Sequence, residues 1–101
     1  MDSGWCIARE LRGRAERQHL GRWSLPLPKR RQIVSDAVER LPEPLRLVLT
    51  LRYCEGLGVR ELAETLDLTP REVNRAISTA VTEIYRSLVR AEKLARAGGT
   101  G

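Results

Sequence analysis

Apolar side chains recur at every third or fourth position along most of the chain, which is the spacing of one face of an α-helix. The pattern predicts helices over residues 6–20, 29–41, 44–54 and 59–66, and a last helix of about 20 residues from Pro70. Residues 21–28 are expected to be non-helical, because Pro26 and Pro28 each remove a backbone donor and favour extended geometry before them. The predicted fold is therefore an all-α helical bundle that ends in a long helix.

The start of the last helix carries two independent signals. Thr69 is well placed as the N-cap, with Pro70 at the first helical position and Glu72 three residues after the cap. Such a cap contributes about 1 kcal/mol to helix stability. Further upstream, the Gly-Leu-Gly run of residues 56–58 can supply the left-handed geometry that ends the helix before it.

Residues 59–78 have the spacing of a helix-turn-helix, with small Ala63 where the two helices cross. The apolar positions that this unit needs are filled by Leu62, Leu66, Leu68, Val73 and Ala76. The departure is Asp67, which stands in the turn where glycine is usual. Asp tolerates a positive φ better than most residues, so we expect the turn to form.

The second helix of this unit has a polar face opposite its apolar stripe, and in a helix-turn-helix this face enters the major groove of DNA. Side chains that can read base edges there are Arg71, Asn74, Arg75, Ser78 and Thr82. Arg60 and Thr79 are predicted to reach flanking phosphates. The alternative is a helix pair that serves only for packing, whose solvated face is polar in any case.

The length and the charge narrow the class of protein. A chain of 101 residues and 11.4 kDa allows one domain with a modest core, which excludes a multi-domain enzyme. The formal net charge is +5 with a pI of about 10.0, and arginine supplies 16 of the 18 basic residues. This charge is typical of a protein that binds a polyanion, although a biased genome composition would produce the same excess.

The basic residues gather at the two ends of the chain. Residues 1–31 carry a net charge of +5, residues 32–68 carry −3, and residues 69–101 carry +3. We therefore expect a basic N-terminal arm with a proline-rich strap over 1–31, a helix-turn-helix domain over 32–96, and a flexible tail over 97–101. The arm offers contacts to phosphates or to a partner through Arg12, Arg14, Arg17, Arg22, Arg30 and Arg31.

Catalytic chemistry is not visible in the sequence. Cys6 and Cys54 lie far apart and His19 is the single histidine, so no metal site, cofactor site or catalytic triad is predicted. No stretch without charge exceeds seven residues, and no secretory signal is recognised at the N-terminus. The expected protein is a cytoplasmic non-enzyme without a membrane segment.

Residues 36–90 resemble the C-terminal helix-turn-helix domain, region 4, of bacterial sigma factors. The resemblance rests on Ala37 to Glu43, on Leu45 to Tyr53, on Glu55-Gly56-Leu57 and on the helix-turn-helix. It implies that the last helix reads promoter DNA and that the domain contacts the β flap of RNA polymerase. The matching reading positions are Arg71, Glu72, Asn74, Arg75 and Thr79. Pro70 and Glu83 stand where sigma factors often have basic residues, and Gly58 replaces a usual Ser or Thr. We therefore expect weaker binding to DNA phosphates than in sigma factors.

The layout of the chain is also similar to that of phage Q-type antiterminators and other small sigma-like regulators. A lone helix-turn-helix buries only about 600–1,000 Å² on DNA, so a partner is implied. The sequence thus predicts a positive regulator of transcription, monomeric, that binds double-stranded promoter DNA and RNA polymerase through its β flap, its sigma subunit or both, with antitermination as the preferred mode. The alternatives are a sigma mimic or anti-sigma module that does not bind DNA, and a dimeric operator-binding regulator.

Overall fold

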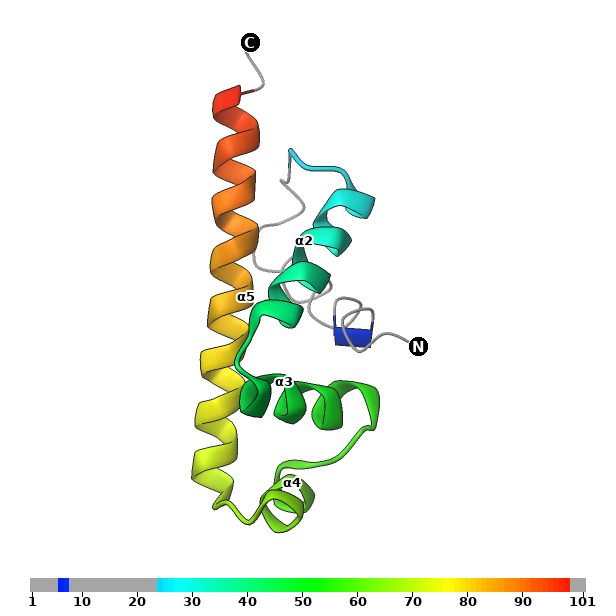
Figure 1. The fold of residues 1–101 in the computed structure, drawn as a ribbon, viewed down its shortest axis with the longest axis vertical. Helices are drawn as coiled ribbons and strands as arrows, with labels where there is room; N and C mark the ends of the chain where they lie inside the picture. Colours follow the sequence, from blue (N-terminus) through cyan, green and yellow to red (C-terminus); the bar gives the residue numbers. More distant parts are fainter. Residues whose placement is uncertain (1–5, 8–23, 99–101) are drawn as a thin grey trace.

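The computed structural model describes residues 6–7 and 24–98, and every structural statement below refers to these residues. The long helix α5 (Pro70–Gly98) runs along the molecule. Helices α2 (Leu27–Arg40), α3 (Glu43–Leu49) and α4 (Val59–Leu66) pack along one side of it (Figure 1). The described part of the chain contains no β-strand, and the predicted all-α fold is confirmed.

Helix α2 begins two residues earlier than the apolar pattern predicts. Pro26 is the residue before the helix and Pro28 lies within its first turn. Proline is tolerated there, because the first amide groups have no partner inside the helix and the ring fixes φ at a helical value. The expectation of a non-helical segment over residues 21–28 is therefore wrong for Leu27 and Pro28.

The helix predicted over residues 44–54 is present, but its second half is wound more widely. After α3 the chain continues as a π-helical segment, η1 (Thr50–Cys54), where the Glu55 amide donates to the Thr50 carbonyl at 3.2 Å. The chain then turns at Gly56, whose φ of +77° is a left-handed value that glycine adopts without strain. Gly58 is extended, with a φ of −77°, so Gly56 alone supplies the left-handed geometry.

Two apolar clusters hold the helices together. The larger one joins α2, α3 and α5 through buried side chains, namely Ile7, Val34, Ala37, Val38, Leu41, Leu49, Ala80, Ile84 and Leu88. The smaller one lies between α4 and α5 and contains Leu62, Ala63 and Val73. Ile77 packs against both clusters, so the α4–α5 pair is fixed to the rest of the fold.

Helix α5 is longer than the sequence pattern indicates. It has 29 residues and therefore measures about 44 Å, against the expected 20 residues. Residues 91–97 contain alanine, leucine, lysine, arginine and glutamate, all strong helix formers, and Glu92 continues the buried side of the helix. Ala97 and Gly98 thus belong to α5 and not to the flexible tail expected over residues 97–101.

The N-terminal arm is described only in part. Cys6 and Ile7 are helical, as expected, and Ile7 is fully buried in the larger cluster. The other arm residues singled out by the sequence, Arg12, Arg14, Arg17 and Arg22, lie outside the described residues.

A buried carboxylate ties the segment that enters α2 to the distal half of α5. Glu92 is 7% exposed and accepts hydrogen bonds from the Ser24 amide at 2.8 and 3.0 Å and from the Leu25 amide at 3.1 Å. The Nε of Arg96 donates to the same carboxylate at 2.9 Å. Burial by itself raises the pKa of Glu92, but these hydrogen bonds outweigh it and lower the pKa to about 2. Neither the residue type nor the spacing of Glu92 in the sequence indicates this contact.

Candidate nucleic-acid interface

Helix α4 begins at an incomplete cap. Its N-cap residue is Gly58, whose amide donates to the Glu61 carboxylate at 2.9 Å. Glycine has no side-chain oxygen, so the reciprocal bond of a capping box is missing. The helix occupies Val59–Leu66, the bounds that the sequence pattern predicts.

The turn between α4 and α5 depends on one left-handed residue. Asp67 has φ 56° and ψ 48°, and the Leu68 amide donates to the Ala63 carbonyl at 2.9 Å. This backbone bond closes the C-terminal end of α4, as a left-handed residue after a helix commonly does. The expectation that aspartate can replace the usual glycine is confirmed.

Helix α5 begins at the predicted capping box. The Glu72 carboxylate accepts from the Thr69 amide at 2.9 Å, and the Thr69 hydroxyl accepts from the Glu72 amide at 3.1 Å. The hydrogen bond from the Thr69 amide, with the nearby charge of Arg75 adding to it, lowers the pKa of Glu72. Glu72 is one of the reading positions implied by the resemblance, but its carboxylate is held in the cap.

The predicted reading face is exposed along the N-terminal half of α5. Asn74 and Ser78 are one helical turn apart, as are Arg71 and Arg75, while Val73 on the opposite side is fully buried. The whole predicted set is exposed, namely Arg60, Arg71, Asn74, Arg75, Ser78, Thr79 and Thr82. None of these side chains makes a hydrogen bond or an ion pair with another described residue. Their donors are therefore available to a ligand.

Arg60 is the member of this set that comes from α4. It lines the same hollow as Pro70, so the structure places it beside the N-terminal end of α5. This arrangement places a cation of the first helix near the start of the second. A helix-turn-helix commonly uses such flanking cations for contacts to phosphates.

The basic residues predicted on the arm are not part of this face where they are described. Arg30 and Arg31 are half-buried in α2. The Nη1 of Arg30 donates to the Leu25 carbonyl at 2.8 Å, so this side chain holds the segment that enters the helix.

The geometry defines a helix-turn-helix domain: a short helix, a left-handed turn and a capped second helix with an exposed polar face. The family described as Sigma-70, region 4, matches residues 31–84, and the chain belongs to this family. In the part of the chain that the structure describes, no helix is long and apolar enough to cross a membrane. The domain family is non-enzymatic and binds DNA in transcription.

The curated proteins that match this chain include RNA polymerase sigma factors, in agreement with the family match. The chain is 40% identical over 58 residues to the RNA polymerase sigma factor FliA of Salmonella typhimurium, and 38% identical over 58 residues to FliA of Escherichia coli K12. Each match covers 57% of this chain and 24% of the sigma factor, so the chain spans about a quarter of the length of these relatives. No solved structure matches.

Proposed function

We propose that this protein regulates transcription by binding double-stranded promoter-region DNA through the N-terminal half of α5. The observation that carries the proposal is the exposed set of Arg71, Asn74 and Arg75 on a helix-turn-helix of the sigma region 4 family. Within residues 6–7 and 24–98 these side chains make no hydrogen bond or ion pair. Arginine can pair with guanine and asparagine with adenine in the major groove. Arg60 and Thr79 then contact phosphates at the edges of the groove.

RNA polymerase is the proposed partner. A single helix-turn-helix has a small footprint on DNA, so a second contact is needed for tight specific binding. The sigma factor relatives support polymerase as that second contact, through its β flap, its bound sigma subunit or both. We propose that the chain acts as a monomer and positively, and that antitermination is its preferred mode.

The test of DNA binding begins with selection of a preferred site from random duplexes by the purified protein. Arg75→Ala is expected to weaken binding to the selected site roughly tenfold, because one bidentate base contact is lost, while binding to a scrambled duplex changes little. The matched control is Arg86→Ala, which removes an exposed arginine of the same helix that forms an ion pair with Glu83 at 3.2 Å. Binding is measured by fluorescence anisotropy over a range of salt concentrations.

The outcomes separate the proposal from its rivals. If Arg75→Ala weakens both duplexes equally, Arg75 contacts only phosphate. If the wild-type protein binds no duplex, the chain is a protein-interaction module. A dimer in light scattering together with a palindromic selected site indicates a conventional operator-binding regulator.

The mode of action needs its own experiment. The protein is added to polymerase on a template with its selected site near the promoter and a terminator downstream. Antitermination predicts more transcript beyond the terminator with the number of initiated chains unchanged. An increase in initiated chains without added read-through contradicts antitermination and supports initiation control.

A further inference from the structure

The two cysteines of the chain, Cys6 and Cys54, lie at the same apolar cluster. They are 48 positions apart in the sequence, and the chain has no third cysteine, so a single pairing within one molecule exists. Cys6 precedes Ile7, which is fully buried in the larger cluster. Cys54 is the last residue of η1 and packs against the same cluster. Residues 6–7 lie next to the C-terminal end of the continuous α3 and η1 helix (Figure 1).

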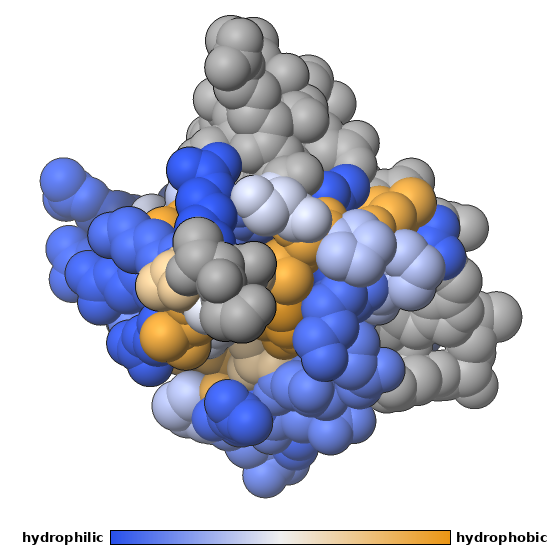
Figure 2. Space-filling view, turned by 90° about the horizontal axis from the view of Figure 1, so that it is seen from above, coloured by the Kyte–Doolittle hydropathy of each residue, from blue (hydrophilic) through white to orange (hydrophobic). Residues whose placement is uncertain are grey.

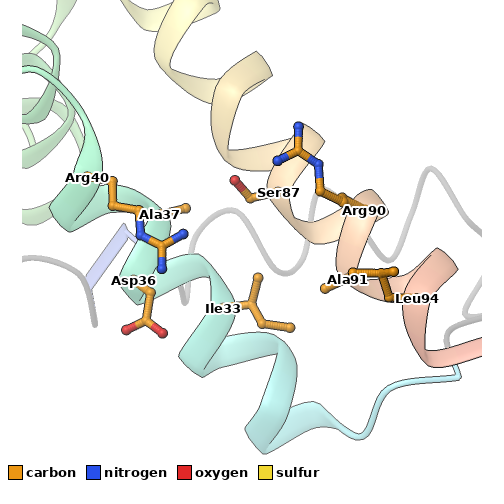
Figure 3. Close-up of a pocket in the computed structure, with 8 residues that line it drawn as sticks. All are labelled: Ile33, Asp36, Ala37, Arg40, Ser87, Arg90, Ala91 and Leu94. Carbon is orange, nitrogen blue, oxygen red and sulfur yellow. The ribbon is translucent and has the colours of Figure 1, made fainter. Parts of the chain in front are cut away.

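The larger cluster fixes the position of Cys6 through its neighbour Ile7. Seen from the C-terminal end of α5, apolar side chains occupy the centre of the surface and hydrophilic ones surround them (Figure 2). In a close-up from another side, Ala37 of α2 belongs to the cluster, and the ribbon of residues 6–7 is visible next to α2 (Figure 3). Ile7 is therefore packed where α2 meets α3, and it holds Cys6 on the side of the fold that carries η1.

Both cysteines are accessible to small reagents. Each is half-buried, and neither forms a disulfide in this structure. A partly exposed thiol can exchange with a dissolved disulfide, whereas a fully buried thiol is inert. A disulfide requires two Cα atoms within about 7 Å of each other, which two residues at one part of a cluster can reach by a small backbone shift.

We propose that Cys6 and Cys54 form an intramolecular disulfide that fastens the N-terminal segment to η1 under oxidising conditions. The oxidant is a low-molecular-weight disulfide, RSSR. One cysteine thiolate attacks RSSR and gives a mixed disulfide and one RSH, and the other thiolate then displaces the second RSH. The two thiols lose two electrons and two protons, and RSSR is reduced to two RSH. In a reducing compartment both residues stay thiols, so the bond responds to the redox state.

The disulfide fixes the N-terminal end of the basic segment of residues 8–23. This segment carries five arginines and two glutamates. Its other end is already held, because Glu92 accepts hydrogen bonds from the amides of Ser24 and Leu25. Oxidation therefore ties the segment to the body of the fold at both ends. Cys6 lies outside the family match of residues 31–84, and the proposal goes beyond the proposed function and does not depend on DNA binding.

The test measures disulfide formation in the full chain, with mixtures of reduced and oxidised glutathione as the redox buffer. After acid quenching, mass spectrometry distinguishes the internal disulfide, a monomer about 2 Da lighter, from glutathione adducts and covalent dimers. The internal disulfide is expected as the main oxidised product. The effective concentration of the two thiols is expected to be at least about tenfold higher in buffer than in about 8 M urea, because the fold holds the cysteines together.

Thermal unfolding provides a second measurement. The disulfide closes a long loop in the unfolded chain, so the Tm of the oxidised protein is expected to lie at least about 5 °C above that of the reduced protein. Cys6→Ser cannot form the bond and is expected to have the same Tm in both buffers. Cys54→Ala is the second control and keeps an apolar side chain against the cluster, and circular dichroism verifies the fold of both variants.

The proposal is overturned by any of three results. The first is that glutathione adducts or covalent dimers, and not the lighter monomer, are the main oxidised products of the wild-type protein. The second is an effective concentration that is no higher in buffer than in urea, which would mean that the fold does not bring the cysteines together. The third is a rise of Tm on oxidation that Cys6→Ser shows equally.

Discussion

Glu92→Gln removes a negative charge from the buried junction of α5 with residues 24 and 25 while keeping the size of the side chain. The wild-type carboxylate accepts hydrogen bonds from the backbone amides of Ser24 and Leu25 and from the guanidinium group of Arg96. Glutamine keeps one good acceptor oxygen, and its amide nitrogen is a donor that cannot accept the hydrogen bonds of the two backbone amides or of Arg96. We therefore expect the substitution to destabilise the fold at neutral pH.

The magnitude follows from the pKa of Glu92. A lowering from the ordinary value of 4.5 to about 2 corresponds to on the order of 3 kcal/mol of stabilisation by the ionised form. Because the folded pKa is depressed, this stabilisation is complete above pH 4.5 and is lost as the pH falls towards 2. Since glutamine retains part of the hydrogen bonding, we expect a loss of about 1–3 kcal/mol at pH 7.

The assay is urea unfolding followed by far-UV circular dichroism, at pH 7 and at several values between pH 5 and 2.5. The free energy of unfolding of the wild-type protein is expected to fall more steeply over that pH interval than that of Glu92→Gln. The two curves of unfolding free energy against pH therefore converge at low pH. The control is Glu83→Gln on the same helix. The ion pair of Glu83 with Arg86 is more than half exposed on both sides, so the control is expected to lose at most a few tenths of a kcal/mol.

Two results would refute this reasoning. A loss at pH 7 no larger than that of Glu83→Gln would mean that the junction does not contribute to global stability. A difference between wild type and Glu92→Gln that is the same at pH 3 as at pH 7 would mean that the charge of Glu92 is not its source.

Two further predictions concern the helix-turn-helix. Gly58→Ser is expected to stabilise the protein by about 0.5–1 kcal/mol in urea unfolding, because serine completes the cap and restricts the unfolded chain. A Cβ at this position lies 3.5 Å from the Glu61 carboxylate, which is an ordinary contact distance. A loss of stability would contradict this prediction. Ala63→Leu is expected to cost about 1–3 kcal/mol and to weaken DNA binding, because Ala63 is buried where the helices cross. Thr65→Leu, on the exposed side of α4, is the control, and an equal effect would refute the packing argument.

Local signals in the sequence were sufficient to predict the helix-turn-helix. The ends of α4, the left-handed Asp67 and the capping box of Thr69 and Glu72 each depend on interactions between residues no more than five positions apart. These interactions are local and depend little on the rest of the fold, so spacing and residue type predict them. The exposure of the predicted reading face follows from the same periodicity, because its residues share the side of the helix opposite Val73.

Tertiary structure decided the rest. The junction of Glu92 with Ser24 joins groups 68 positions apart, and neither residue type nor spacing indicates that they meet. The widened η1 segment and the full length of α5 likewise emerged only in the folded chain. The packing of α2 against α5 likewise joins segments that lie far apart in the sequence. Contacts between distant segments form only when the helices pack, so a periodic pattern, which records one helix at a time, carries no signal for them.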